Sequence, residues 1–206
     1  ENNRDIISLD GKELNGSGRN NSTNGRIKNI QAMSAYSTKY EITLATEFIE
    51  EKTNEIPTGP KLLSRLNLEN TIITFDALNT QEKTIEYIIK NKGDYVAPVK
   101  ANQGNLYENL VEYFDIDELK NKSNYYSEKE KEHSSIETRD YYLVSDVEWI
   151  SNKKKWRNLT SIGIVEKTIS NLTTGEVKTE TRYYITSLYD SELKDFVKSV
   201  RSEWEI

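Results

Sequence analysis

A short apolar run at residues 72–75 ends in a single carboxylate, Asp76, and the rest of the pattern is arranged around it. The segment that follows, residues 81–90, carries apolar residues at helical spacing: Ile85, Ile88 and Ile89. Asn79 and Thr80, between the two, are residue types that begin helices. The pattern predicts a buried strand followed by a helix. The acid would then lie at the carboxyl end of the strand, where α/β sheets gather their ligands.

The same periodicities predict the other elements of the N-terminal part. Strands are expected at residues 5–10, 30–36, 40–46, 71–76 and 95–100, and residues 47–53 form a further extended segment. Helices are expected after Pro57, with Leu62, Leu63 and Leu66 on one side, and at residues 81–90 and 105–120. Residues 13–27, rich in Gly, Asn and Ser, and the charged residues 121–133 are expected to be loops.

The C-terminal third has a different pattern. Segments 136–145, 159–169 and 177–188 are rich in Thr, Tyr, Ile and Val and predict an antiparallel sheet, and residues 190–204 predict a helix. We therefore expect a core at 1–134, an antiparallel β insertion at 135–188, and the start of a last helix at 189–206. This order is typical of a ribonuclease H-like α/β fold, with a mixed five-stranded sheet flanked by helices.

Composition narrows the class of protein. The chain has 206 residues, of which 35% are hydrophobic and 30% charged, and it has no cysteine and one histidine. A disulfide framework, a thiolate metal site and a His-based metal cluster are therefore excluded. No apolar run reaches the ~18–20 residues of a membrane span. The net charge of −6 argues mildly against nucleic acid, although clustered carboxylates at a metal site also lower the net charge.

Two acids are candidate metal ligands. Asp10 ends the first predicted strand and Asp76 ends the fourth, which would be its neighbour in the mixed sheet. Phosphodiester cleavage uses two Mg²⁺ ions ~3.5–4 Å apart, and hard cations prefer carboxylate oxygens. Converging acids at neighbouring strand ends favour such a site. The alternative is that each is a turn or cap residue.

Three other sets of residues each allow a functional and a structural interpretation. Lys153–Lys155, with Trp156 and Arg157, could hold a DNA backbone or form a solvated turn. Glu137 and Arg139 share one face of a predicted strand, which favours an ion pair over a DNA or metal role. His133 is expected to be a solvated loop residue.

Several motifs in order along nearly the whole chain resemble one family, the H-repeat-associated (IS-As-one-like) DDE-type insertion-sequence transposases. These motifs are Asp10-Gly11-Lys12, Lys52-Thr53-Asn54-Glu55-Ile56-Pro57, Ile73-Thr74-Phe75-Asp76-Ala77-Leu78-Asn79-Thr80-Gln81, Asp94-Tyr95-Val96, Lys100-Ala101-Asn102-Gln103 and Arg182-Tyr183-Tyr184-Ile185-Thr186-Ser187-Leu188.

The resemblance implies a catalytic core that cuts and joins DNA at insertion-sequence ends with Mg²⁺ or Mn²⁺. Asp10 and Asp76 would be the first two acids of the catalytic triad and ligands of the metal. The DNA contacts would come from Lys12, Lys100, Asn102 and Gln103. The DNA would be the terminal inverted repeats of the insertion sequence and the target DNA. The resemblance also implies a bacterial, cytoplasmic, nucleoid-associated protein, with no membrane partner and with homodimerisation as an option.

The chain departs from the family at its C-terminus. The third acid of the family is a Glu that would follow Ile206, and Glu203 and Glu205 replace residues usual in the family. The resemblance therefore implies a fragment that is inactive in cleavage, although Glu203 could approach the site from one helical turn back. The alternatives are a remnant that binds DNA or a protein without chemistry, and a structural β-rich module.

Overall fold

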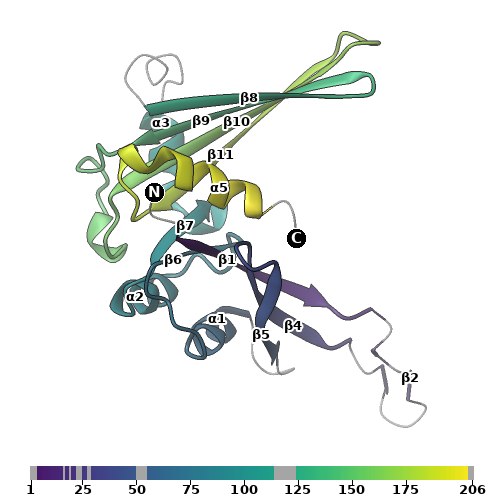
Figure 1. Cartoon of the computed structure of the whole chain (residues 1–206), viewed down its shortest axis with the longest axis vertical. Helices are drawn as coiled ribbons and strands as arrows, with labels where there is room; N and C mark the ends of the chain where they lie inside the picture. The colour runs from purple at the N-terminus through teal and green to yellow at the C-terminus, as the bar shows by residue number, and fades with distance from the viewer. Residues whose placement is uncertain are drawn as a thin grey trace. The chain divides into compact units, whose positions relative to one another are not determined.

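The computed structural model describes residues 4–15, 17–18, 20–21, 25–26, 29–49, 55–113 and 124–203. The chain divides into two units, the first comprising Glu1–Tyr95 and Arg201–Ile206 and the second Val96–Val200. Strand β7 (Asp94–Val99) and helix α5 (Leu193–Ser202) each begin in one unit and end in the other (Figure 1). None of the described helices is long and apolar enough to cross a membrane.

The first unit contains a mixed sheet. Its strands are β1 (Asp5–Glu13), β4 (Gln31–Ser37), β5 (Ile42–Ile49) and β6 (Thr71–Phe75), in the order β5-β4-β1-β6. The pairs β1–β4 and β4–β5 are antiparallel, whereas β6 runs parallel to β1. Three antiparallel strands, joined on the β1 side by a parallel strand, form the mixed sheet expected of a ribonuclease H-like domain, and the predicted fold class is confirmed. A separate short ladder pairs β2 (Asn20–Asn21) with β3 (Gly25–Arg26).

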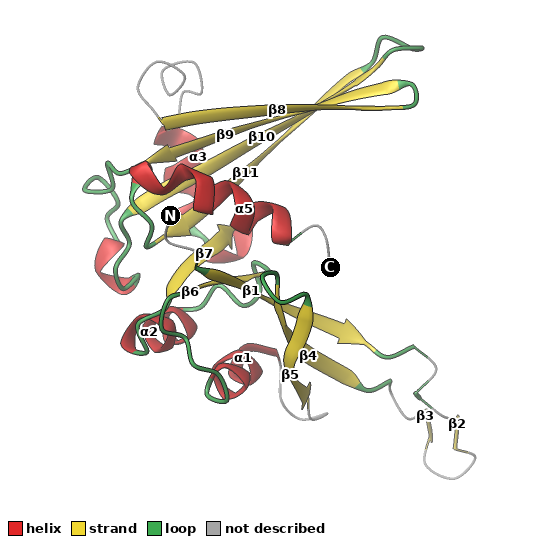
Figure 2. Cartoon of the chain, viewed as in Figure 1, coloured by secondary structure: helices red, strands yellow, loops and turns green. Residues whose placement is uncertain are grey.

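Two helices cover one side of this sheet. Helix α1 (Glu55–Leu63) packs against β4, β5 and α2 (Glu82–Lys90), as Figure 2 shows. Strands and helices together supply the fully buried core residues Ile7, Met33, Leu62, Leu63, Ile73, Ile85 and Ile88. Glu47 of β5 pairs with Lys61 of α1 at 2.6 Å, and the hydrogen bond from Lys61 lowers the pKa of Glu47. Arg65 donates to the carbonyl oxygen of Thr46 at 3.0 Å.

The second unit contains an antiparallel sheet. Its strands are β8 (Asn124–Glu132), β9 (Ser135–Val144), β10 (Ser161–Asn171) and β11 (Val177–Thr186), and β11 pairs with residues 96–99 of β7. Their order is β7-β11-β10-β9-β8. The remaining elements are η1 (Ala101–Gln103), α3 (Asn105–Tyr113), η2 (Lys153–Lys155) and η3 (Asp190–Glu192). The three strands predicted in this region are therefore found within a few residues of their expected bounds.

Helices cover only one end of the long strands. Tyr107 of α3 makes an edge-to-face contact with Tyr183, and Phe196 of α5 makes one with Tyr184. Tyr183 and Tyr184 are consecutive in β11, so α3 and α5 contact opposite faces of the sheet. The distal halves of β8–β11 extend past both helices (Figure 1), and residues 135–140 and 166–171 are half-buried at every position.

The structure corrects three expectations. The charged segment 121–133, expected as a loop, contains strand β8 over Asn124–Glu132. Its hydrophobicity is low because β8 is the outermost strand of its sheet and is exposed along most of its length. Segments 40–46 and 47–53 were separate in the pattern, but residues 42–49 form the single strand β5. The helix expected to include Leu66 ends at Leu63. Of the predicted elements, residues 50–54, 114–123 and 204–206 lie outside the described part of the chain.

Candidate active site

The parallel register of β1 and β6 brings Asp10 and Asp76 to neighbouring strand positions. Leu9 is opposite Phe75, and the next residue on each strand is an acid. Adjacent strands lie ~4.8 Å apart, so two successive acids of this kind share one end of the sheet. Both are open to solvent: Asp76 is exposed, and the Asp10 side chain is 36% exposed. The two acids are neighbours, as the sequence suggested, but Asp10 does not end its strand: β1 continues to Glu13, and only Asp76 directly follows the end of a strand.

Asp76 also shapes the turn that follows β6. Its Oδ1 accepts hydrogen bonds from the backbone N–H of Asn79 at 3.1 Å and from Asn79 Nδ2 at 3.0 Å. The alternative interpretation of Asp76, as a residue that stabilises a turn, is therefore correct for its Oδ1 atom. Among the described residues, no hydrogen bond reaches Oδ2. One oxygen of the carboxylate is held in place, and the other can bind a cation.

Lys12 is the basic residue beside the acids. Its Nζ lies 3.3 Å from Asp10 Oδ2, and its side chain is 62% exposed. Residues 10 and 12 lie on the same face of β1 because successive strand side chains alternate. An exposed ammonium group at this position can contact a phosphate approaching the two acids. The pair with Asp10 is solvent-exposed and easily exchanged, since such pairs contribute only ~0–1 kcal/mol.

The end of α5 is attached to the same face of the sheet. Ser8 donates to Ser202 Oγ at 3.1 Å, and Thr74 donates to Glu203 Oε1 at 3.1 Å. Ser8 and Thr74 each precede one of the two acids by two residues, which places Glu203 about 7 Å back along the strands. The expectation that Glu203 lies one helical turn short of the third acid stays a prediction, because the described part of the chain ends at Glu203. No group of three acids suited to a metal ion occurs among the described residues.

The other predicted DNA contacts belong to the second unit. Lys100 follows β7 directly, and Asn102 and Gln103 lie in η1; Lys100 and Asn102 are exposed. Gln103 accepts a hydrogen bond from the backbone N–H of Lys100 at 2.8 Å, so its side chain closes the turn. The structure thus groups Asp10, Asp76 and Lys12 in one unit and the Lys-x-Asn-Gln residues in the other.

The remaining charged candidates have structural explanations. Arg139 pairs with Glu137 on its own strand and lies 3.6 Å from Glu128 of β8, while Lys167 of β10 pairs with Glu137 at 2.9 Å. The predicted ion pair is therefore part of a cross-strand network.

The lysine cluster and the histidine lie in turns. Lys153 pairs with Glu148, and Trp156 is buried rather than free to stack on a base, which favours the turn reading of residues 153–155. His133 lies in the turn between β8 and β9 with φ of 46°. Sequence reasoning did not identify the roles of Asn79, Ser8 and Thr74. Only Asn79, three residues after an aspartate, carried a signal, because Asp side chains commonly cap such turns.

The fold and its paired acids define the class of protein as an α/β domain with two carboxylates on neighbouring strands. The family model described as "Transposase DDE domain" matches residues 1–194, and the chain belongs to this family. The H repeat-associated putative transposase YhhI of Escherichia coli is 33% identical over 208 residues, covering 98% of this chain and 54% of YhhI.

Two more Escherichia coli relatives agree. The putative protein YbfL is 33% identical over 210 residues, covering 100% of this chain and 54% of YbfL. The H repeat-associated putative transposase YbfD is 37% identical over 146 residues, covering 70% of this chain and 56% of YbfD. The H-repeat-associated resemblance is thus confirmed, and the chain spans about half the length of these relatives.

Proposed function

We propose that this chain is part of the catalytic core of a bacterial insertion-sequence transposase, in which Asp10 and Asp76 bind the catalytic divalent metal. The observation that carries the proposal is the parallel register Leu9–Phe75, which makes the two acids neighbours. Membership of a DDE transposase family implies use of a divalent metal in general. Mg²⁺ and Mn²⁺ are the candidates, because both prefer carboxylate oxygens.

The residues present fit such an ion. Asp76 Oδ2 accepts no hydrogen bond from the described residues, and within the same part of the chain the Asp10 carboxylate is paired with the exposed Lys12. When bound, a divalent metal activates water or a 3′-hydroxyl as the nucleophile and stabilises the leaving oxygen. Asn79 orients Asp76 through two hydrogen bonds. Lys12 attracts the scissile phosphate, and Lys100 and Asn102 contact the DNA backbone elsewhere.

Residues 1–206 supply two of the three acids that the family resemblance implies. Mg²⁺ keeps most of its waters and relies on few protein ligands plus substrate phosphate, so two carboxylates bind it weakly. We therefore propose that this chain binds a metal ion and DNA but does not cleave DNA by itself. Glu203 does not replace the third acid, because Thr74 holds its carboxylate two residues back from the strand ends.

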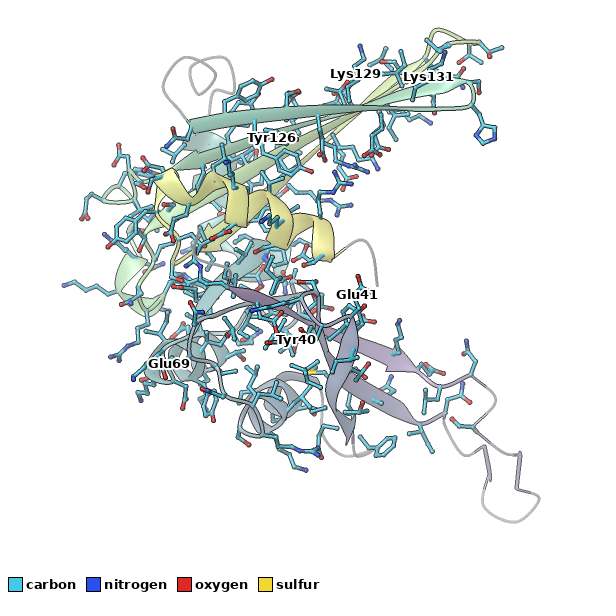
Figure 3. All side chains as sticks on the ribbon, in the orientation of Figure 1. Tyr40, Glu41, Glu69, Tyr126, Lys129 and Lys131 are labelled. Atoms are coloured by element: carbon cyan, nitrogen blue, oxygen red, sulfur yellow. The ribbon has the colours of Figure 1, made fainter. Side chains whose placement is uncertain are left out.

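Metal titration tests this proposal. Isothermal titration with Mn²⁺ should give weak binding to the chain and at least a tenfold loss in Asp10→Asn and in Asp76→Asn, which preserve shape. Glu69→Gln is the matched control. Glu69 is an exposed acid paired with Lys92 at 3.0 Å, and it lies before the amino end of β6 (Figure 3). Equal Mn²⁺ affinity in all four proteins would overturn the metal-site assignment.

A cleavage assay separates the catalytic core from the second candidate, a remnant that binds DNA or a protein without chemistry. The DNA should carry matched inverted repeats, and the buffer should contain Mn²⁺. Adding the residues that follow position 206 in a full-length family member should produce cleavage that Asp76→Asn abolishes. No cleavage by the extended chain, with DNA binding retained, would favour the remnant. Cleavage by residues 1–206 alone would contradict the proposed inactivity.

A further inference from the structure

An exposed aromatic ring lies on the same sheet face as the two acids. Phe48 of β5 is 61% exposed, which is unusual for a phenylalanine within a strand of a sheet. Its register partner on β4 is Ala32, and the partner of Ala32 on β1 is Lys12. Residues directly opposite each other in a sheet share a face. Lys12, Ala32 and Phe48 therefore form one row across three strands, with the small Ala32 in the middle.

The neighbouring row contains the acid. Asp10 is opposite Ser34, and Ser34 is opposite Thr46, with 3.2 Å between the two hydroxyl oxygens. Strands lie ~4.8 Å apart and rise ~3.3 Å per residue, so the Cα of Phe48 lies about 12 Å from that of Asp10. That span corresponds to three or four steps of a duplex with ~3.4 Å rise per base pair. The ring is therefore within a few nucleotides of a phosphate bound at Asp10.

The exposed apolar surface continues at the far end of the same face. Leu14 and Ile30 are 43% and 47% exposed, and the Leu14 N–H donates to the Ile30 carbonyl at 2.8 Å. The opposite face is different: Met33 and Ile49 are buried there, on the side where α1 packs. The exposure of the Phe48 ring is therefore not explained by incomplete burial at the margin of the core, because the core lies on the opposite face of the sheet.

The side chains around Phe48 favour nucleic acid over a second copy of the chain as the ligand. A stable contact with a second copy of the chain needs about 800 Å² of apolar surface per partner, and an ammonium, two hydroxyls and a carboxylate interrupt this surface. An aromatic ring in one row with a cation two strands away instead suits single-stranded nucleic acid, because a base can stack on the ring while the cation meets the backbone.

We propose that Phe48 is a stacking platform for an unpaired nucleobase of the DNA strand whose phosphate lies at Asp10 and Lys12. This inference rests on the proposed function and extends it to substrate structure: the site takes DNA with an unpaired or flipped base near the cleavage point. Unstacking a base costs a few kcal/mol, and a waiting aromatic surface offsets part of that cost. Phe48 positions the strand and has no role in the chemical step.

The test measures binding of two fluorescent probes by anisotropy: a duplex with an unpaired thymidine tail and the same duplex with blunt ends. The chain should prefer the tailed probe. Phe48→Ala should weaken tailed-probe binding about 5- to 150-fold, since base stacking on one aromatic ring contributes ~1–3 kcal/mol. Phe48→Tyr should retain it. Replacing a thymidine of the tail with 5-iodouracil should give a photo-crosslink that maps to Phe48.

Ile42→Ala is the matched control. Ile42 lies on the same strand and is half-exposed, but it is opposite Ser37 and, through it, Ile7, on the face opposite to Asp10 and Asp76. Its substitution should leave both affinities unchanged. If Phe48→Ala lowers the melting temperature, Phe48→Leu tests the stacking role instead, because leucine keeps the apolar bulk but has no π surface.

Each remaining outcome decides against the proposal. Tailed-probe binding that Phe48→Ala and Phe48→Leu leave unchanged overturns the stacking role and leaves the proposed function standing. A wild-type chain that binds neither probe overturns the proposed function and this inference together. If Phe48→Ala instead converts a dimer to a monomer in sedimentation, the ring is a contact between copies, and the inference is wrong.

Discussion

At the scale of single residues, the site depends on how one carboxylate divides its two oxygens. Asp76 uses Oδ1 to cap the turn through Asn79, and its Oδ2 accepts no hydrogen bond from the described residues. The two roles support each other, because a carboxylate fixed by two hydrogen bonds loses less conformational entropy when it binds an ion. Ligands held by hydrogen-bonded neighbours in this way bind metals more tightly.

Asn79→Ala should therefore weaken Mn²⁺ binding by about tenfold, as is typical when a hydrogen-bonding neighbour of a metal ligand is removed. The measurement is isothermal titration alongside the wild-type chain. Gln81→Ala is the control, since Gln81 donates from the same turn to the Leu78 carbonyl and not to Asp76. Unchanged affinity in Asn79→Ala, with the fold intact by circular dichroism, would show that the turn does not orient the acid.

The sequence predicted that Asp10 and Asp76 are neighbours, because both follow apolar runs of strand type. It placed Asp10 at the end of its strand, whereas β1 continues to Glu13, where polar residues hid the strand from the pattern. It did not predict the pairing of Lys12 with Asp10 or the cap at Asn79, because these depend on side-chain rotamers that no periodicity specifies. The exposure of Phe48 could not be predicted from the sequence for a related reason. An apolar residue in a strand pattern is assigned to the core, and only the register shows that it faces outward.

At the scale of elements, buried strands were easier to predict than exposed ones. Strands β6, β10 and β11 contain apolar, β-branched residues that a sheet buries. Strand β8 alternates Glu and Lys instead, since an edge strand is solvated on both faces, and composition alone suggested a loop. The position of α5 on the sheet was also not predictable. A Cβ on Gly163 of β10 would lie 2.3 Å from ring atoms of Phe196. The Phe196 ring of α5 therefore packs directly on the strand backbone.

Gly163→Ala should destabilise the fold by about 1–3 kcal/mol, the usual cost of forcing an extra group into a packed core. Chemical denaturation measures it. Gly59→Ala is the control, since its added Cβ would meet only Asn79 Oδ1 at an ordinary 3.6 Å, and it should be neutral or stabilising. Phe196→Leu in the Gly163→Ala background should recover part of the loss. Equal stability of Gly163→Ala and wild type would mean that α5 shifts freely on the sheet.

At the scale of the whole molecule, β5 and β8 are the outermost strands of the strand order, and the outer edge of each must avoid pairing with another chain. Strand β5 ends the first sheet, with a bulge in its pairing with β4 and with Arg65 bonded to the Thr46 carbonyl. Strand β8 ends the second sheet and alternates Glu and Lys from residue 128 to 132. Two antiparallel copies of β8 related by a two-fold axis would place Glu opposite Glu and Lys opposite Lys, which is destabilising.

Replacing Lys129 and Lys131 (Figure 3) with Val should therefore cause self-association, because one face of the β8 edge becomes apolar and loses its charge repulsion. Sedimentation velocity across a concentration series measures it. The control removes two charges from helices instead, Lys83→Ala with Lys198→Ala, so that the net charge is the same. If both double variants remain monomeric to the same concentration, the alternating charges do not protect this edge.

The parallel pairing of β1 with β6 also sets when the two acids can meet as the chain folds. Strands β1, β4 and β5 are neighbours both in sequence and in space, whereas Leu9 and Phe75 are 66 positions apart. Closing that longer loop carries an entropic cost that local pairings avoid, and non-local contacts of this kind slow folding. We therefore expect Asp10 and Asp76 to meet late in folding. Under the proposed function, an ion that binds only the assembled pair draws the folding equilibrium toward the native state, so metal occupancy would report that this unit of the chain has finished folding.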